Sequence, residues 1–215
     1  AEGVFAAVSR VHKRLRGSYA VVALIAGKGL LAFRDPYGIR PICFGSNMQE
    51  NGKLEYMVSS ESVTMIGLGF KVERDLAPGE ALWIDLKGNV STRQCAENPV
   101  LSPCAFEWVY FARPDSTMDG INVYAARLKL GEYLAETLKH EIDLSEIDVV
   151  MPIPDSSRPC AQQLAQVLSL PYREGFIKNR YVGRTFIMPG QAVRKKSVRQ
   201  KLCPHYFLDY QETLD

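Results

Sequence analysis

The pattern of apolar residues changes type near residue 95, and this change limits the folds open to the chain. Residues 18 to about 93 carry short β-type runs separated by turn signals such as Asn51-Gly52 and Pro78-Gly79. Strands joined by such tight turns pair with their neighbours, which predicts a largely antiparallel sheet. Beyond about residue 122, helix-like and strand-like runs alternate, which is typical of α/β structure. The sequence therefore predicts two architectures in one chain.

Helices are expected at two places in the first part. Apolar residues recur at helical spacing over residues 1–16, and Gly17 is a stop signal. A second, short helix is expected near Glu61–Leu68. The expected strands are Tyr19–Ala26, Gly29–Phe33, Ile42–Gly45, Glu55–Ser59 and Ala81–Ile84.

The second part follows an irregular connector over residues 94–122, which contains the aromatic-rich segment Phe106–Phe111. Residues 122–142 predict an amphipathic helix. The nearly continuous apolar run Ile147–Ile153 predicts a strand buried on both faces. A helix after Pro159 and a strand around Tyr172–Ile177 would complete a βαβ unit with parallel strands.

Composition excludes several classes of protein. The chain has 215 residues, of which 47% are hydrophobic, and a net charge of +2, so it is not disordered as a whole. The longest apolar run, Tyr19–Gly27, is far shorter than the roughly 20 residues of a membrane-spanning helix. The five cysteines are odd in number and form no CxxC pair, which favours a reduced, cytoplasmic protein without a disulfide framework.

One candidate site is the segment Pro152–Ser157, at the carboxyl end of the expected strand and the start of the next helix. Ligands bind at this edge of open α/β sheets, and a helix N-terminus favours an anion such as phosphate. The hydroxyl groups of Ser156 and Ser157 could add donors or reach a metal-bound ligand. The alternative is that one of these serines only caps the helix.

A second candidate is the basic stretch from residue 173 to residue 201, which has no sustained helical or strand period. It predicts a long functional loop whose cations neutralise a multiply charged phosphate. A solvated run of charge is the simpler alternative. A nucleic-acid patch is a third, which near-neutrality of the whole chain disfavours. The cations are Arg173, Lys178, Arg180, Arg184, Arg194, Lys195, Lys196, Arg199 and Lys201, against the single acid Glu174.

Several motifs resemble the amidophosphoribosyltransferase family, from about residue 1 to Leu202. The least specific is Asp35–Pro41, which related Ntn-type amidotransferases share in large part. The most specific are Glu107–Ser116, which resembles the family's interdomain signature, and Lys178–Ile187, which resembles its flexible loop. Further matching segments are Arg16–Ala20, Ala32–Pro41 and Ser59–Ser62.

The resemblance implies a fold of mixed class, α+β followed by α/β. Residues 1–93 would be the C-terminal part of an Ntn-hydrolase glutaminase domain with αββα layers. Residues 94–215 would be the N-terminal part of a type I phosphoribosyltransferase domain. The family transfers the glutamine amide nitrogen to phosphoribosylpyrophosphate (PRPP) with Mg²⁺, in purine biosynthesis. The full-length enzyme would be a homo-oligomer, with no nucleic-acid or membrane partner.

The resemblance also assigns roles to residues. Ser156 matches a hydroxyl position near Mg²⁺, and Tyr110 should lie where the two domains meet. Lys178 through Leu202 matches the loop that closes over the substrate, in which Phe186 should line the ammonia route. The expected substrate-binding residues of this loop are Lys178, Arg180, Tyr181, Arg184 and Phe186.

Two functional parts of the family match no position here: the N-terminal cysteine nucleophile and the Asp-Asp loop that binds ribose and Mg²⁺. We therefore expect the chain to be a fragment that is inactive alone, and no catalytic residue is assigned. The tail after Leu202 does not resemble the family. Cys104 matches the first of four cysteines that hold an iron–sulfur cluster in some members, but without the other three no cluster is expected.

Three other functions stay open at this point. A free-standing phosphoribosyltransferase would carry an acidic ribose loop. A sugar-phosphate isomerising amidotransferase would lack the loop Lys178–Ile187. A non-enzymatic module that binds nucleic acid through the basic stretch would show a steep dependence of affinity on salt.

Overall fold

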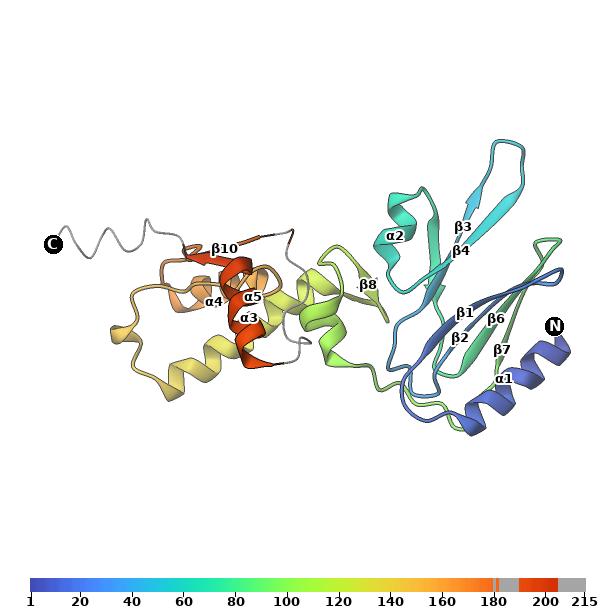
Figure 1. The fold of residues 1–215 in the computed structure, drawn as a ribbon, viewed down its shortest axis with the longest axis horizontal. Coiled ribbons are helices and arrows are strands. Elements are labelled where there is room, and N and C mark those ends of the chain that lie inside the picture. The colour runs from blue at the N-terminus through green and yellow to red at the C-terminus, as the bar shows by residue number, and fades with distance from the viewer. Residues whose placement is uncertain (180, 182–189, 205–215) are drawn as a thin grey trace. The chain divides into compact units, whose positions relative to one another are not determined.

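The computed structural model describes residues 1–179, 181 and 190–204 of the chain (Figure 1). The chain divides into two compact units, residues 1–124 and 125–215. The domain boundary expected between residues 93 and 94 follows the family resemblance and stays a prediction. Among the described residues, no helix combines the length and apolar character needed to cross a membrane.

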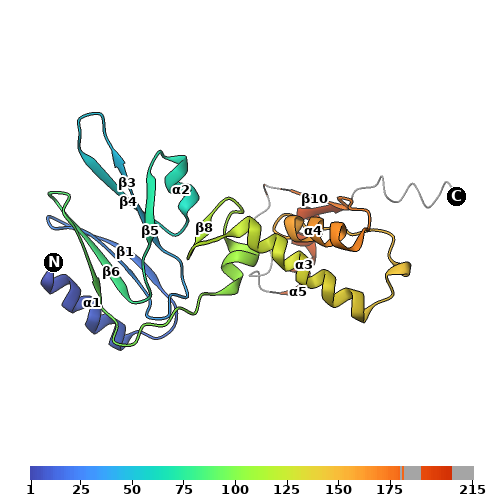
Figure 2. The same ribbon diagram turned by 180° about the vertical axis from the view of Figure 1, so that it is seen from behind.

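Two antiparallel sheets and a helix form most of the first unit. The larger sheet has the order β1 (Ala20–Ile25), β2 (Gly29–Arg34), β6 (Glu80–Asp85) and β7 (Val90–Gln94). The smaller sheet has the order β4 (Leu54–Ser59), β3 (Cys43–Met48) and β5 (Lys71–Asp75). Helix α1 (Glu2–Arg14) begins the chain, and α2 (Ser62–Gly67) lies beside β5 (Figure 2). The mixed fold with antiparallel sheets that the sequence predicted is confirmed.

The central strands β2 and β6 are buried on both faces. On one face, Leu31 and Trp83 pack against Phe5 and Val8 of α1. On the other face, Ala32, Leu82 and Ile84 form a second core with Ile42, Phe44 and Leu76. This two-sided burial explains why both strands are nearly continuously apolar, whereas β1 alternates between exposed and half-buried residues.

The first unit ends with two short elements that the sequence pattern did not resolve. Residues Glu107–Phe111 form one turn of π-helix, labelled η1. They are followed by a two-stranded ribbon of β8 (Thr117–Met118) and β9 (Ile121–Asn122). The connector, which was predicted to pack because of its aromatic content, is packed only in part. Trp108 and Met118 are buried, but Phe106, Tyr110 and Phe111 are exposed.

The second unit is built mainly from helices. Helix α3 (Val123–Glu141) leads into it from the first unit, and a short 3₁₀ turn, η2 (Leu144–Glu146), follows. Helix α4 (Arg158–Leu168) packs closely on α3 at Gly131, where a Cβ would come within 2.4 Å of the carbonyl oxygen of Cys160. Strands β10 (Phe176–Lys178) and β11 (Leu202–Pro204) form an antiparallel ribbon, joined to α5 (Gln191–Lys201).

Two predictions for the second unit are wrong. Ile147–Ile153 is not a buried strand: it forms a single β-bridge, at Val150, and Met151 and Ile153 are exposed. Among the described residues it pairs only with the segment around Tyr172, so its other edge and its faces are not covered as a strand inside a sheet would be. The basic stretch was expected to lack regular structure, yet residues 191–201 form α5, which carries five of its cations and exposes Val193 and Val198.

The buried guanidinium of Arg34 organises the motif Asp35–Pro41. All five of its N–H groups donate: to the carbonyl oxygens of Gly38, Arg40 and Leu76, and to both carboxylate oxygens of Asp119 at 2.6 and 2.8 Å. The neighbouring carboxylate of Asp35, also fully buried, accepts the backbone N–H groups of Tyr37, Ile39 and Arg40. The motif therefore has a structural role: the ion pair of Arg34 with Asp119 connects the C-terminal end of β2 to the turn between β8 and β9.

Replacing this guanidinium should destabilise the first unit strongly. Arg34→Lys keeps the charge but leaves buried carbonyl groups without a donor, so we expect the free energy of unfolding to fall by about 3 kcal/mol. Both tryptophans, Trp83 and Trp108, lie in this unit, so urea unfolding followed by tryptophan fluorescence reports it separately.

The matched control is Arg113→Lys, because Arg113 pairs with Asp115 on the surface. Its cost should stay below about 1 kcal/mol. Equal losses in the two variants would contradict the role assigned to Arg34.

Candidate anion-binding site

The carboxyl end of the segment 148–153 and the start of α4 form the candidate site. Val150 is placed by a parallel bridge to Tyr172: its N–H donates to Pro171 at 2.9 Å, and its carbonyl accepts from Arg173 at 3.1 Å. Helix α4 is the crossover between these two segments. The parallel pairing predicted for this βαβ unit is thus present at one position. The turn at residues 154–157 follows this position, as a ligand-binding turn does in open α/β sheets.

Ser157 is the N-cap residue of α4, but its hydroxyl does not cap the helix. The Oγ atom instead donates backward to the carbonyl oxygen of Ile153 at 2.6 Å. Pro159 takes an early position of the helix, as predicted. Capping by the Ser157 side chain, the alternative weighed for this serine, is therefore wrong; Ser156 beside it is half-buried.

A chain of alternating charges runs across the turn to the segment that follows α4. The Nζ atom of Lys178 lies 2.6 Å from Oδ2 of Asp155, and Arg158 lies 3.6 Å from Oδ1 of the same carboxylate. Arg158 also pairs with Glu174 at 3.1 Å, which in turn accepts the hydroxyl of Tyr172 at 2.9 Å. Two cations thus stand beside the N-terminus of α4, where the helix dipole also favours an anion.

The environment of Tyr172 changes its acidity. Burial, the hydrogen bond to Glu174 and the negative charge of Glu174 together raise the pKa of Tyr172 to about 12. The phenol therefore stays protonated and remains a donor to Glu174 over the neutral range. Glu174, which accepts this hydrogen bond, pairs with Nη2 of Arg158, whereas Nη1 of Arg158 faces Asp155.

The predicted substrate-binding residues are brought together only in part. Lys178 lies in β10 and reaches the predicted turn at Asp155. Tyr181 is fully exposed, and its N–H donates to the side chain of Asn179. Tyr110 lies in η1 of the first unit, half exposed and in edge contact with the ring of Phe111. Arg180, Arg184 and Phe186 lie outside the described residues.

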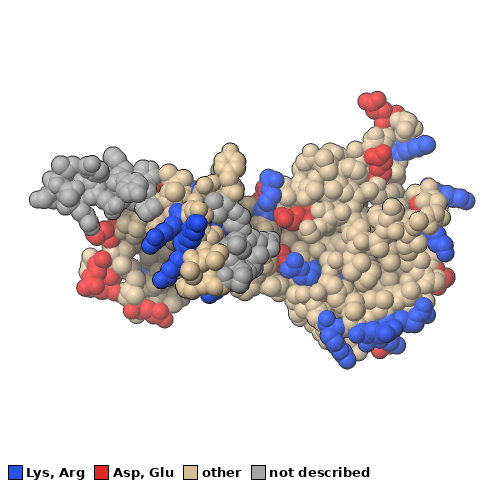
Figure 3. All heavy atoms as spheres, viewed as in Figure 1, with Lys and Arg blue, Asp and Glu red and all other residues tan. Residues whose placement is uncertain are grey.

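The second half of the basic stretch forms a cationic face on α5. Figure 3 shows Lys and Arg side chains gathered over this helix, and acidic side chains elsewhere on the same unit. Asp155 and Glu174 lie within the two predicted segments but were given no role, and the sequence-derived site did not include Arg158 or Tyr172. The spacing of Asp155 and Arg158, three residues apart at a helix start, is a signal that could have found that pair.

The turn offers too few oxygen donors to hold Mg²⁺ by itself, so a bound ligand would have to supply most of the oxygens around the ion. The hydroxyl of Ser156 is an oxygen donor of the kind that Mg²⁺ prefers, whereas the carboxylate of Asp155 already pairs with Lys178 and Arg158. However, the described residues contain no group of three His, Cys, Asp or Glu side chains that could hold a metal ion. The site thus fits an ion carried by a diphosphate, with the hydroxyl oxygen of Ser156 beside it.

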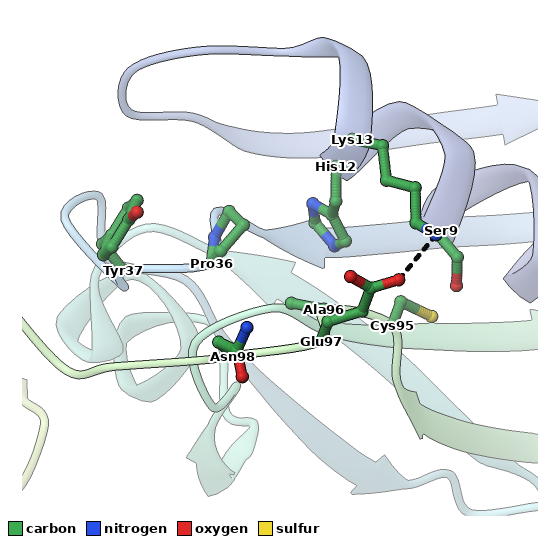
Figure 4. Close-up of a pocket in the computed structure, with 9 residues that line it drawn as sticks. All are labelled: Ser9, His12, Lys13, Pro36, Tyr37, Cys95, Ala96, Glu97 and Asn98. Atoms are coloured by element: carbon green, nitrogen blue, oxygen red, sulfur yellow. Dashed lines mark ion pairs between the residues drawn. The ribbon is translucent and has the colours of Figure 1, made fainter.

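A separate pocket of about 190 Å³ lies in the first unit, between α1 and the segment after β7 (Figure 4). Lys13 and Glu97 pair across it at 2.6 Å. Burial lowers the pKa of His12 and raises the pKa of the Cys95 thiol, so neither side chain is charged near neutrality. The pocket therefore offers no thiolate nucleophile. It is lined by Ser9, His12, Lys13, Pro36, Tyr37, Cys95, Ala96, Glu97 and Asn98.

The raised pKa of Tyr172 is testable by titration. Because the folded chain binds this proton more tightly than the unfolded chain does, the contribution of the group to stability is complete below about pH 10. It is lost as the pH rises through the folded pKa of about 12. We expect Glu174→Gln to shift the pKa of Tyr172 downward, since the charge and the acceptor weaken while burial stays. NMR of ¹³C-labelled tyrosine measures the pKa of Tyr172 in the unaltered chain and in Glu174→Gln, and Tyr172→Phe assigns the signal. The same pKa in both proteins would contradict the pairing of Tyr172 with Glu174.

The comparisons with known proteins give one consistent result. The chain is 61% identical, over 94% of its length, to an amidophosphoribosyltransferase of Pseudomonas aeruginosa. It is 54% identical to that of Escherichia coli and 50% identical to that of Saccharomyces cerevisiae, again over 94% of its length. It spans about 40% of the length of these relatives. No family model matches the chain.

Solved structures agree with the sequence relatives. A glutamine PRPP amidotransferase from B. subtilis, complexed with ADP and GMP, superposes with a TM-score of 0.73 at 37% identity. That match covers 93% of this chain and 41% of the other. A structure described as the allosteric regulatory enzyme of purine biosynthesis gives the same TM-score at 38% identity. The resemblance predicted from the motifs is confirmed: this chain is homologous to amidophosphoribosyltransferases and corresponds to about 40% of their length.

Proposed function

We propose that this chain is part of an amidophosphoribosyltransferase. Such an enzyme transfers the amide nitrogen of glutamine to PRPP and yields 5-phosphoribosylamine, glutamate and pyrophosphate in purine (IMP) biosynthesis. The similarity extends over both compact units, which favours this function over a free-standing phosphoribosyltransferase. The observation that carries the proposal within the structure is the position of Lys178, against the turn that opens α4.

In the proposed reaction, ammonia released from glutamine attacks C1 of the ribose. The bond from C1 to the diphosphate oxygen breaks, its electron pair leaves with pyrophosphate, and the nitrogen loses a proton. The protein must stabilise the charge that develops on the leaving oxygen. Lys178, Arg158 and the first amides of α4 supply positive charge at one place for this purpose. Bound Mg²⁺ would neutralise part of the diphosphate charge.

The remaining site residues belong to the same proposal. Ser156 would contribute its hydroxyl near the ion. Tyr181, Arg180 and Arg184 would contact the substrate when the segment after β10 closes and excludes water. Phe186 would line the path of ammonia, and Tyr110 would lie between a glutaminase part, residues 1–93, and a phosphoribosyltransferase part, residues 94–215. We also propose a cytoplasmic homo-oligomer for the complete enzyme.

The test of the anion site is binding of inorganic pyrophosphate, with MgCl₂, by isothermal titration calorimetry. Lys178→Gln removes a charged donor, so we expect the dissociation constant to rise by about 10- to 100-fold. Lys139→Gln is the matched control, because Lys139 is a cation of the same unit that pairs with Glu136 on the surface of α3. Equal affinities for all three proteins, or no binding by the unaltered chain, would contradict the assignment.

Residues 1–215 alone are expected to catalyse neither half-reaction. In the resembling family the glutamine nucleophile is an N-terminal cysteine, which matches no position here, and the chain spans about 40% of its relatives. Glutamate release from glutamine and pyrophosphate release from PRPP measure the two reactions separately. Turnover above the uncatalysed rate in either assay, with purified chain, would refute this expectation.

A further inference from the structure

We propose that Asp155 is an exchangeable counter-ion for Lys178. It holds the lysine in the anion-free state and gives it up when a diphosphate binds. The inference rests on the proposed function of Lys178 as an anion-binding residue. It adds that the carboxylate of Asp155 competes with the diphosphate for Lys178. In the structure, Nζ of Lys178 contacts Oδ2 of Asp155 at 2.6 Å.

The geometry of the pair supports a specific contact. The separation of 2.6 Å between Nζ of Lys178 and Oδ2 of Asp155 is at the short end for a charge-assisted hydrogen bond. The side chains are 28% and 42% exposed, so solvent screens their attraction less than it would on an open surface. Both backbones are also anchored, because Lys178 pairs with Leu202 in the β10–β11 ribbon and Asp155 leads into α4. Forming the pair therefore orders little more of the chain.

The second cation at Asp155 makes the exchange reversible at low cost. When Lys178 moves to a phosphate, Asp155 keeps Arg158, which lies 3.6 Å from its other oxygen. Arg158 is in turn oriented by Glu174 at 3.1 Å. No carboxylate is then left without a cation, so the charge chain can take two arrangements. In one, Asp155 pairs with both Lys178 and Arg158; in the other, it keeps Arg158 while Lys178 faces the anion.

The carboxylate must also oppose the anion that it makes way for. A phosphate bound to Lys178 in place of Asp155 lies within a few ångströms of that carboxylate, and like charges at this distance repel each other. Removing the negative charge of Asp155 should therefore raise the affinity for the phosphate in two ways. Lys178 no longer has to break an ion pair, and the repulsion between carboxylate and phosphate disappears. For a half-exposed pair the two effects together correspond to about three- to tenfold in affinity.

The experiment measures pyrophosphate binding, with MgCl₂, by calorimetry for the full chain and for four variants: Asp155→Asn, Lys178→Gln, the double variant with both substitutions, and Asp148→Asn. Asp155→Asn should bind about three- to tenfold more tightly than the unaltered chain. In a Lys178→Gln background the same substitution should give no such gain, because no lysine is left to release. Asp148→Asn is the control for net charge, since it removes one exposed carboxylate from the same unit; its affinity should change by less than twofold.

The outcomes separate this inference from the proposed function. If the unaltered chain and Lys178→Gln both fail to bind pyrophosphate, the anion site itself is wrong. If the unaltered chain binds and Lys178→Gln weakens binding, but Asp155→Asn does not tighten it, only the exchange is overturned. A second readout needs no anion: amide hydrogen exchange over residues 176–178 should be faster in Asp155→Asn than in Asp148→Asn. Equal rates would also overturn the exchange.

Discussion

The pairing of Arg34 with Asp119 is the interaction on which the first unit depends most. It is a buried, two-pronged ion pair whose cation also satisfies three carbonyl groups from separate parts of the chain. A buried charge pair of this kind stabilises a structure only if every remaining polar group has a partner, and here every guanidinium N–H has one. The contacts of Arg34 and Asp35 thus give the least specific motif of the family resemblance a role in folding.

Much of this unit could be predicted because its signals are local. Gly17 ends the first helical pattern, and Asn51-Gly52 lies in the turn between two paired strands. Strands β5 and β7 escaped prediction because their burial alternates weakly and both are rich in polar side chains, as in Lys71–Asp75. The π-turn over Glu107–Phe111 could not be foreseen, since it depends on contacts such as that of Glu107 with Arg40.

The place of the candidate site in the sequence was predicted, but its contacts were not. A helix start after an apolar run and a distant basic stretch predicted an anion site, and the family resemblance added Lys178 to it; both assignments stay predictions. The partners of Lys178 depend on tertiary structure: Asp155 lies 23 positions earlier in the sequence, and contacts such as the bridge between Val150 and Tyr172 bring the two segments together. Continuous apolar sequence at Ile147–Ile153 could not show that the segment has one paired edge among the described residues.

The two-sided burial of β2 and β6 has a consequence for how their alignment is specified. In a sheet with one wet face, a slip of one residue moves apolar side chains into water and is strongly penalised. Between α1 and the second sheet, the same slip would exchange one apolar layer for the other, which penalises it far less. The alignment must then be fixed at the strand end, where Arg34 and Asp35 can reach their buried partners in one position only.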